Sequence, residues 1–237
     1  QQLKTFLDSL PEDERGRKQH LPIATMPSFV GMEFNQPSFS DEEILALIVA
    51  AALDEKPQTV LRLAIATIYG CRVGEIAKLS SKSFGLNHNV GVIDVPTEKR
   101  GKRVPQPIPE ELLPLFRIPL KTRKKDCIEC DLKRICRKAN IKLRYRLGIH
   151  GIRRSVVTTL YSSTDLKEIS IRRFLRWSEG RESGSMPRYV KTPAQVTDIE
   201  VLEKHPYVEM WKSVMSYLSS LPQYQPYVHF NEIPGFE

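Results

Sequence analysis

The sequence of 237 residues lacks the features that mark membrane proteins, secreted proteins and many metal-dependent enzymes. No apolar run approaches the length of a bilayer span, and no charged segment followed by an apolar one resembles a secretory leader. The chain has no Walker-type phosphate-binding loop, no HExxH pair of histidines and no tight acidic cluster. These absences argue against metal-dependent integrases and most nucleases. We expect an intracellular, cytoplasmic protein that needs no cofactor and no membrane.

Cysteine is also scarce, with four residues in the whole chain. Cys127, Cys130 and Cys136 form a C-x2-C-x5-C pattern, but a tetrahedral zinc site needs four ligands and no fourth lies close in the sequence. We therefore expect no metal site here. A local disulfide is the alternative for a hyperthermophilic host, and plain buried thiols are the default expectation.

Positive charge is abundant and unevenly distributed. The formal net charge is +8, yet residues 99–189 hold 24 Lys or Arg against 9 Asp or Glu, so the remainder of the chain is acidic. A basic central block is what contact with a phosphate backbone requires. We expect double-stranded DNA as the partner, an association with the nucleoid, and binding that weakens steeply as salt rises.

Six residues in a fixed order stand out against this background. They are Arg72, Lys99, His150, Arg153, Trp177 and Tyr189. The first lies in GCRVGEIAKL between two helical patterns, and the second lies in VIDVPTEKRGKRVPQPIP, which reads as two short strands joined by a basic turn. HGIRR opens a helix, FLRW ends one, and MPRYV follows a loop. The conjunction carries more weight than any single motif.

This arrangement resembles the catalytic domain of the tyrosine recombinases, the lambda-integrase type, and most closely the integrases of archaeal viruses and plasmids. The resemblance covers roughly residues 38–191 and implies a mainly α domain with a small antiparallel β-sheet, an α+β fold. It also implies site-specific cutting and rejoining of DNA attachment sites through a covalent 3′-phosphotyrosyl intermediate, without metal or ATP. The family usually has LGH where this chain has FLRW, so Trp177 replaces a histidine, and the gap from Trp177 to Tyr189 is slightly long.

The resemblance assigns roles to the phosphate-facing residues. Arg72 and Arg153 form a clamp, because a guanidinium stays protonated and offers a planar fork to phosphate oxygens. Trp177 shapes the pocket and donates one hydrogen bond from its indole N–H, or serves only as a core anchor. Glu75, three residues after Arg72, orients an active-site side chain from behind.

The resemblance also assigns the proton transfers. Tyr189 is the nucleophile, and His150 accepts its proton because imidazole exchanges protons near neutral pH. Lys99 protonates the leaving 5′-oxygen, with Lys102 as the neighbour that could replace it. If Tyr189 is not the nucleophile, another tyrosine such as Tyr207 takes that role.

Further basic residues are expected to contact DNA. They are Lys82, Arg100, Lys102, Arg103, Lys124, Lys125 and Arg154. The alternative for the turn cluster and for KTRKK, residues 121–125, is a solvated charged loop.

Three regions follow from these patterns. Residues 1–37 read as a linker or a remnant of an N-terminal region, and they are too short for the separate helical domain that grips DNA in the family. Residues 38–191 are the catalytic core with the nucleophile. Residues 192–237 are a C-terminal helix and tail, whose apolar stripe packs either on a neighbouring subunit of a DNA-bound tetramer or on its own core. The stripe consists of Trp211, Val214, Met215 and Leu218.

Capping signals and punctuation predict the secondary structure. Ser40 and Glu43 form a capping box before a helix over 41–55, and Pro57 and Gly70 bound the next helix. Short strands are expected within 83–107. Further helices are expected over 109–116, 130–146, 150–162, 166–177 and 198–221, the last interrupted or bounded at Pro206, with no regular helix in the final Pro-rich segment.

Two other functions remain open. A type IB topoisomerase uses the same catalytic residues without strand exchange, acts as a monomer and has little sequence preference. A catalytically decayed, DNA-binding relative would need no tyrosine aligned with two arginines.

Overall fold

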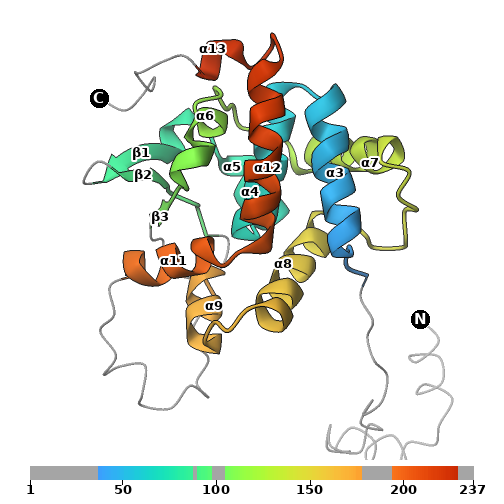
Figure 1. Cartoon of the computed structure of the whole chain (residues 1–237). Coiled ribbons are helices and arrows are strands. Elements are labelled where there is room, and N and C mark those ends of the chain that lie inside the picture. The colour runs from blue at the N-terminus through green and yellow to red at the C-terminus, as the bar shows by residue number, and fades with distance from the viewer. Residues whose placement is uncertain (1–36, 88–89, 98–104, 178–193, 229–237) are drawn as a thin grey trace, which may run out of the picture. The chain divides into compact units, whose positions relative to one another are not determined.

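The computed structural model describes residues 37–87, 90–97, 105–177 and 194–228, all within one compact unit, Gln36–Glu237. This unit is mainly helical with a small three-stranded antiparallel sheet, which confirms the expected α+β class (Figure 1). The region expected to be an N-terminal linker lies almost wholly outside the described residues.

The first helix of the unit starts at the predicted capping box. In α3 (Asp41–Asp54), the Ser40 hydroxyl accepts a hydrogen bond from the Glu43 amide at 3.2 Å, and the Glu43 carboxylate accepts one from the Ser40 amide at 3.0 Å. The next helix, α4 (Pro57–Tyr69), starts with its proline and ends where Gly70 adopts a left-handed conformation, with φ of 55°. Both boundaries were predicted, because proline suits a first turn and glycine tolerates positive φ.

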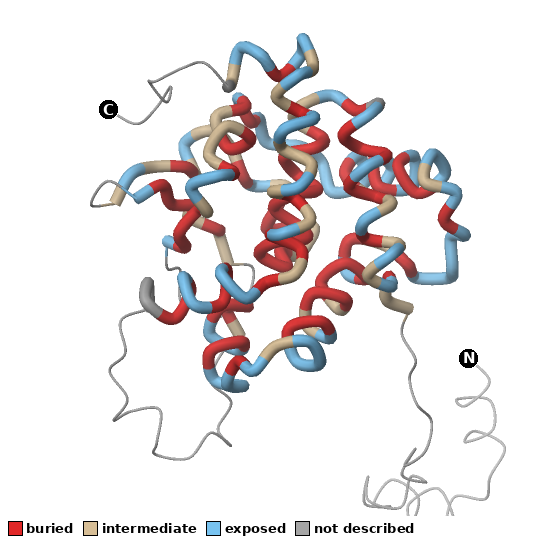
Figure 2. Tube along the Cα trace, in the orientation of Figure 1, coloured by how far each residue is buried: buried red, intermediate tan, exposed pale blue. Residues whose placement is uncertain are grey.

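Helix α4 is the centre of the packing. Every residue from Thr59 to Tyr69 is buried, and α4 is almost entirely red in Figure 2. Helices α3, α8 (Ile149–Ser163) and α12 (Pro206–Ser220) pack against it. A helix that is apolar on all sides is stable only when other elements surround it, so α4 fixes the positions of its neighbours.

The apolar stripe of the C-terminal helix packs within its own chain. Trp211 and Leu218 are buried in the core, and Val214 and Met215 pack against it. The Trp211 indole N–H donates to the Thr67 hydroxyl of α4 at 2.8 Å. Of the two expectations for this stripe, packing on its own core is the one seen.

The sheet consists of β1 (Phe84–Asn87), β2 (Val90–Ile93) and β3 (Gln106–Pro107), in that order. Both pairs are antiparallel, and Val92 pairs with Pro107. The predicted strand pair around the basic turn is therefore confirmed, while residues 98–104 of the turn lie outside the described residues. The Tyr69 hydroxyl donates to the Pro107 carbonyl at 2.8 Å and fixes the sheet to the end of α4.

The remaining elements are short or differ from expectation. They are α5 (Val73–Lys78), η2 (Ser81–Ser83), η3 (Glu110–Leu112), α6 (Leu113–Phe116), α7 (Lys125–Lys138), α9 (Glu168–Phe174), α11 (Ala194–Glu203) and α13 (Gln225–Val228). The break at Pro206 separates α11 from α12 as predicted. None of the helices in the described ranges has both the length and the apolar character that crossing a bilayer requires.

Several predicted helix boundaries were wrong: α11 starts at Ala194 and not at residue 198, and α9 ends at Phe174 and not at residue 177. Two further differences have a local cause. The helix expected over 130–146 is α7, which starts earlier and stops at Lys138, because Asn140 turns left-handed with φ of 54° and the Ile141 amide closes the end on the Cys136 carbonyl at 2.8 Å. The final Pro-rich segment does contain one helical turn, α13, because its proline occupies the first turn, where no amide donor is needed.

Candidate functional site

Arg72 lies at the junction of α4 and α5, where it is the N-cap of α5. Its backbone amide donates to one oxygen of the Glu75 carboxylate at 2.8 Å, and its guanidinium donates to the other at 2.9 Å. The Arg72 side chain keeps 23% of its surface exposed, whereas Glu75 is fully buried. The buried Glu75 carboxylate therefore holds one edge of the Arg72 guanidinium, while part of the Arg72 side chain faces solvent.

Arg153 reaches the same junction from the start of α8. It is 3% exposed and donates to the carbonyl of Gly70 and, at 2.8 Å, to the carbonyl of Leu175. These carbonyls lie just beyond the ends of α4 and α9, where helices leave unpaired acceptors and partial negative charge. Arg153 thus joins the ends of two helices beside Arg72.

Burial, together with the neighbouring guanidinium groups of Arg72 and Arg176, lowers the pKa of Arg153 to about 10. The side chain remains protonated at neutral pH. Arg153 binds the carbonyl of Gly70, two residues before Arg72, so both side chains belong to the same junction. A phosphate anion bound at the partly exposed Arg72 would reduce the repulsion among these guanidinium groups.

A third arginine, Arg176, completes the cluster, and sequence reasoning missed it. Its guanidinium lies 3.4 Å from a Glu75 carboxylate oxygen and donates to the Tyr69 carbonyl at 3.1 Å and to the Gln106 side-chain oxygen. The available signal was its place in FLRW, since LGH, the family motif to which FLRW was compared in the sequence analysis, has glycine at this position. Arg176 has φ of 57°, the left-handed conformation that glycine adopts readily.

Glu75 is the carboxylate that these arginines share. Burial raises its pKa, but the Arg176 guanidinium and the hydrogen bonds from Arg72 outweigh burial, so its pKa lies below the ordinary value. Glu75 is therefore ionised at neutral pH. Three guanidinium groups around one carboxylate leave an excess of positive charge, which is the electrostatic requirement of a phosphate site.

His150 and Trp177 are the other two expected catalytic residues that the structure describes. His150 is exposed on the first turn of α8, three residues before Arg153, and so on the same side of that helix. Trp177 follows Arg176 directly, and its side chain is partly buried against the core. That packing is what the core-anchor alternative predicts. Its backbone amide donates to the Arg172 carbonyl at 3.0 Å and closes the end of α9.

Lys99 and Tyr189, the expected general acid and nucleophile, lie outside the described residues, as do Arg100, Lys102 and Arg103. Four of the six expected catalytic residues are thus placed, and Arg72 and Arg153 are brought together. The alternative nucleophile Tyr207 is fully buried, and its hydroxyl donates to Asp41 at 2.7 Å.

The other expected DNA contacts differ in their surroundings. Lys82, Lys124 and Lys125 are exposed. Arg154 is half-buried, and its guanidinium donates to the Pro37 carbonyl from Nε at 3.0 Å and from Nη2 at 2.6 Å. Part of the Arg154 guanidinium is thus engaged within the protein, whereas the three lysines lie on the exposed surface.

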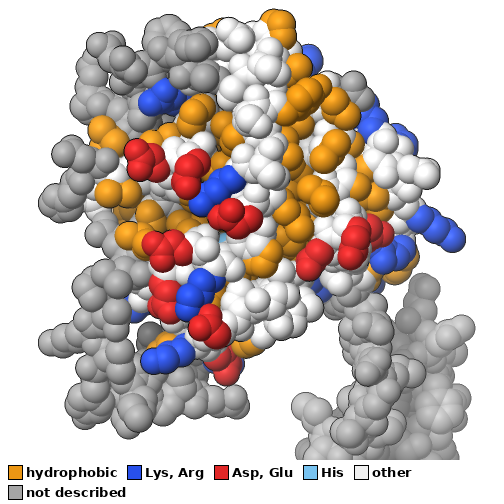
Figure 3. All heavy atoms as spheres, in the orientation of Figure 1, with side chains coloured by type: hydrophobic (Ala, Val, Ile, Leu, Met, Phe, Trp, Pro, Cys, Tyr) orange, Lys and Arg blue, Asp and Glu red, His pale blue; other side chains and the backbone are white. Residues whose placement is uncertain are grey.

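The face shown in Figure 3 is not a basic surface. Acidic and basic side chains are interspersed there, and hydrophobic side chains gather over α3, where Leu45, Val49 and Leu53 are exposed. A phosphate backbone would find no continuous positive field on this face.

All four cysteines are free thiols. Cys71 and Cys136 are buried, but Cys127 and Cys130 are exposed on α7, so the expectation of buried thiols was wrong for these two. They lie outside the core because the apolar face of α7 is formed by Ile128, Leu132 and Ile135 instead. No group of three or more potential metal ligands occurs among the residues that the structure describes.

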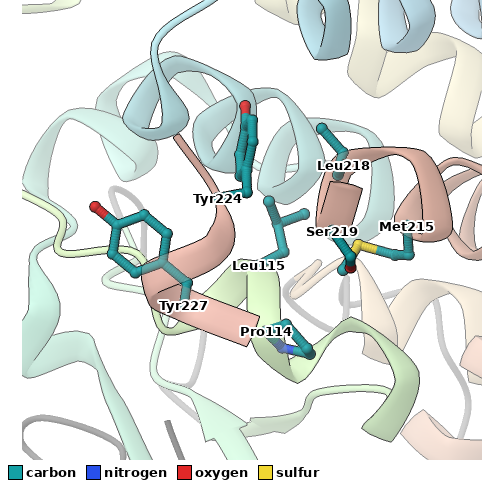
Figure 4. A pocket seen from close by; sticks show the side chains of 7 residues that line it. All are labelled: Pro114, Leu115, Met215, Leu218, Ser219, Tyr224 and Tyr227. Atoms are coloured by element: carbon teal, nitrogen blue, oxygen red, sulfur yellow. The ribbon is translucent and has the colours of Figure 1, made fainter. Parts of the chain in front are cut away.

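A small apolar pocket lies between α6, α12 and α13 (Figure 4). It is lined by Pro114, Leu115, Met215, Leu218, Ser219, Tyr224 and Tyr227. Tyr224 is buried there, and burial raises its pKa, so its hydroxyl stays protonated. The pocket contains no cationic side chain that could bind a phosphate. Its lining residues belong to other elements than the residues of the arginine cluster.

A scan of the chain against protein-family models finds no match, and a search of the curated proteins finds no similar sequence.

Proposed function

We propose that this chain is the catalytic domain of a site-specific DNA recombinase of the tyrosine recombinase type. It would cut and rejoin double-stranded attachment sites, as an integrase does, and act as a tetramer on DNA associated with the nucleoid. The observation that carries the proposal is the meeting of Arg72 and Arg153 around Gly70 and the buried Glu75, from parts of the chain far apart in sequence.

The chemistry requires such a cluster. Negative charge builds on the nonbridging oxygens of a phosphodiester in the transition state, and preorganised positive charge accounts for a large part of the rate enhancement of such reactions. The structure leaves Arg72 partly exposed beside the buried Arg153. Arg72 would contact the phosphate directly. Arg153 would add positive charge from its buried position and hold the ends of α4 and α9 in place.

The proposed reaction transfers one phosphoryl group. The phenolic oxygen of Tyr189 attacks phosphorus, His150 takes the phenolic proton, and the bond from phosphorus to the 5′-oxygen breaks. Lys99 gives the departing 5′-oxygen its proton. The phosphotyrosyl bond keeps the energy of the phosphodiester, so attack by a new 5′-hydroxyl reverses the steps without ATP.

The proposal is tested with nicked duplexes that trap the covalent intermediate. A library of nicked, end-labelled duplexes is incubated with the protein in EDTA, and products are separated on a denaturing gel. We expect a shifted covalent band that is lost in Tyr189→Phe and kept in Tyr145→Phe, since Tyr145 is 83% exposed and belongs to no proposed site.

Plasmid relaxation and DNA-binding assays, run beside the adduct assay, separate the alternatives. Relaxation of supercoiled plasmid without sequence preference would identify a type IB topoisomerase. Salt-sensitive DNA binding with no covalent band from any duplex would identify a decayed DNA-binding relative and contradict the proposal.

A further inference from the structure

Resting on the proposed function, we propose that Arg176 is a positioning residue of the active site. Arg176 holds the Glu75 carboxylate in place, and Glu75 in turn fixes the guanidinium of Arg72 against the DNA phosphate. The family motif LGH, to which FLRW was compared, has glycine at this position. The Arg176–Glu75 contact is therefore a feature of this chain and not of that motif.

The first support is geometric: Arg176 contacts Glu75, and Glu75 contacts Arg72. Arg176 Nη2 lies 3.4 Å from Glu75 Oε2, the same oxygen that accepts the Arg72 amide, and Arg72 Nη1 binds the other oxygen at 2.9 Å. The carboxylate is thus held between the two arginines. Glu75 is fully buried and lies on α5, a helix of only six residues, so its own element gives it little support.

The second support is the cost of placing arginine there. A residue with a Cβ in the left-handed region costs roughly 1–2 kcal/mol. Arg146 has the same conformation, with φ of 61°, but is exposed, whereas Arg176 is 7% exposed. A buried arginine in a strained backbone conformation persists only when its surroundings hold it in place, and strain of this kind is found at functional sites.

The third support is the set of groups that anchor the Arg176 guanidinium. Nη1 donates to the side-chain oxygen of Gln106, and the Gln106 amide donates to the Phe174 carbonyl at 2.9 Å. Nη2 also donates to the Tyr69 carbonyl at 3.1 Å. Gln106 lies on β3, the strand that follows the Lys99 segment, so one guanidinium connects β3 with the ends of α4 and α9.

A purely structural role makes a different prediction. Arg176 also satisfies carbonyls at the ends of α4 and α9, and a residue that did only this would affect stability and not the rate of cleavage. The readout is therefore the single-turnover rate of adduct formation at saturating DNA, measured below the melting temperature of every variant.

Two variants are compared. Arg176→Gly removes the guanidinium and suits the left-handed backbone, and Arg176→Lys keeps a positive charge but cannot form the planar fork. We expect adduct formation to slow roughly 100-fold in the glycine variant and about 10-fold in the lysine variant, because small displacements of a catalytic group have effects of this size. DNA affinity should stay within about twofold, since Arg176 is buried. If the glycine variant does not fold, the lysine variant carries the test.

Matched controls distinguish an effect at the Arg176 site from an effect of the substitution itself. Arg146→Gly and Arg146→Lys make the same changes at the same backbone conformation on the surface and should cleave at the wild-type rate. In an Arg72→Ala background, Arg176→Lys should cause no further loss, because its effect passes through Arg72. Wild-type cleavage by the folded Arg176 variants, or full additivity with Arg72→Ala, would overturn the proposal.

A second readout keeps the two proposals distinct. If the wild-type protein forms no adduct with any duplex, the proposed function fails, and carbon-13 NMR titration of the Glu75 carboxyl decides whether Arg176 holds it. An upward shift of the Glu75 pKa in Arg176→Gly, and a smaller one in Arg176→Lys, would support the contact. An unchanged Glu75 pKa would overturn it.

Discussion

Tyr207 donates its phenolic hydrogen to a carboxylate oxygen of Asp41 at 2.7 Å, although 166 residues separate the two in sequence. The same hydroxyl lies 2.9 Å from the Thr159 hydroxyl. Burial raises the pKa of Tyr207 well above that of a free phenol, so the group stays protonated and inaccessible. Tyr207 therefore joins α3, α8 and α12 and is unsuited to act as the nucleophile.

Tyr207→Phe should lower stability and leave the chemistry intact. Removing the hydroxyl leaves Asp41 and Thr159 with fewer partners, which we expect to lower the free energy of unfolding by about 1–3 kcal/mol. Urea denaturation measures this, with Tyr145→Phe as an exposed control that should change little. Loss of the covalent DNA adduct in the folded Tyr207→Phe protein would return this residue to the list of candidate nucleophiles.

Arg153→Lys should affect stability and cleavage together. One ammonium group cannot reproduce the fork that binds both the Gly70 and the Leu175 carbonyls, so we expect a loss of about 1–3 kcal/mol in the free energy of unfolding. The rate of adduct formation should fall roughly 100-fold or more, as for removal of a donor that stabilises a transition state. The same replacement at Arg137, which is exposed on α7, is the control for unfolding and should be neutral. A stable, fully active Arg153→Lys protein would contradict the account of the clamp.

Gly70→Ala should disturb the site through the backbone. Its φ is +55°, and an added Cβ would lie 2.9 Å from a Leu175 methyl group, so we expect a loss of about 1–2 kcal/mol from the conformation, with more from repacking. Because the Gly70 carbonyl binds Arg153, adduct formation should slow as well. Gly85→Ala is the control, since nothing lies within 4 Å of a Cβ there. Equal thermal melting of the two variants would show that Gly70 is under no constraint.

Asp198 should make stability depend on pH. Burial raises its pKa to about 7, although the Arg176 and Arg173 guanidinium groups and a hydrogen bond from Gln106 oppose the shift. Between about pH 4 and 7 the unfolded chain has lost this proton and the folded chain keeps it, so this group's contribution to stability falls as pH rises through that range. The full effect is roughly 2–4 kcal/mol above pH 7.

Asp198→Asn isolates this contribution. Burial lowers the pKa of His205 to about 4, so that histidine gives the opposite slope, with stability lost as pH falls below about 6.5. Comparing the asparagine variant with wild type cancels the histidine contribution. The stability advantage of Asp198→Asn should grow from pH 5 to pH 8 in chemical denaturation, and an advantage that is constant with pH would show that Asp198 titrates normally.

The parts of the fold that sequence predicts are those that local chemistry determines. The Ser40 capping box, the Pro57 start, the Gly70 stop and the Pro206 break each depend on hydrogen bonds or backbone preferences within a few residues, and each is confirmed. The predicted end of α7 was wrong because the observed end depends on a left-handed Asn140, which no local sequence pattern requires.

The candidate site likewise has parts that local sequence predicts and parts that it does not. His150 and Arg153 lie three residues apart within one helix, so their shared face could be predicted, and Glu75 contacts Arg72 from the first turn of the helix that Arg72 caps. Arg176 was missed because its burial follows from packing against residues far away in the sequence, such as Tyr69. The roles of Lys99 and Tyr189 stay predictions.

The most direct measurement is to identify the residue that becomes bonded to DNA. The trapped adduct is digested with nuclease and protease, and the peptide that carries the nucleotide remnant is sequenced by mass spectrometry. We predict a phosphodiester-linked remnant on Tyr189, in the peptide that contains MPRYV. A remnant on any other residue would contradict the assignment of the nucleophile, and the absence of any linked peptide from a protein that binds DNA would contradict the proposed phosphotyrosyl chemistry.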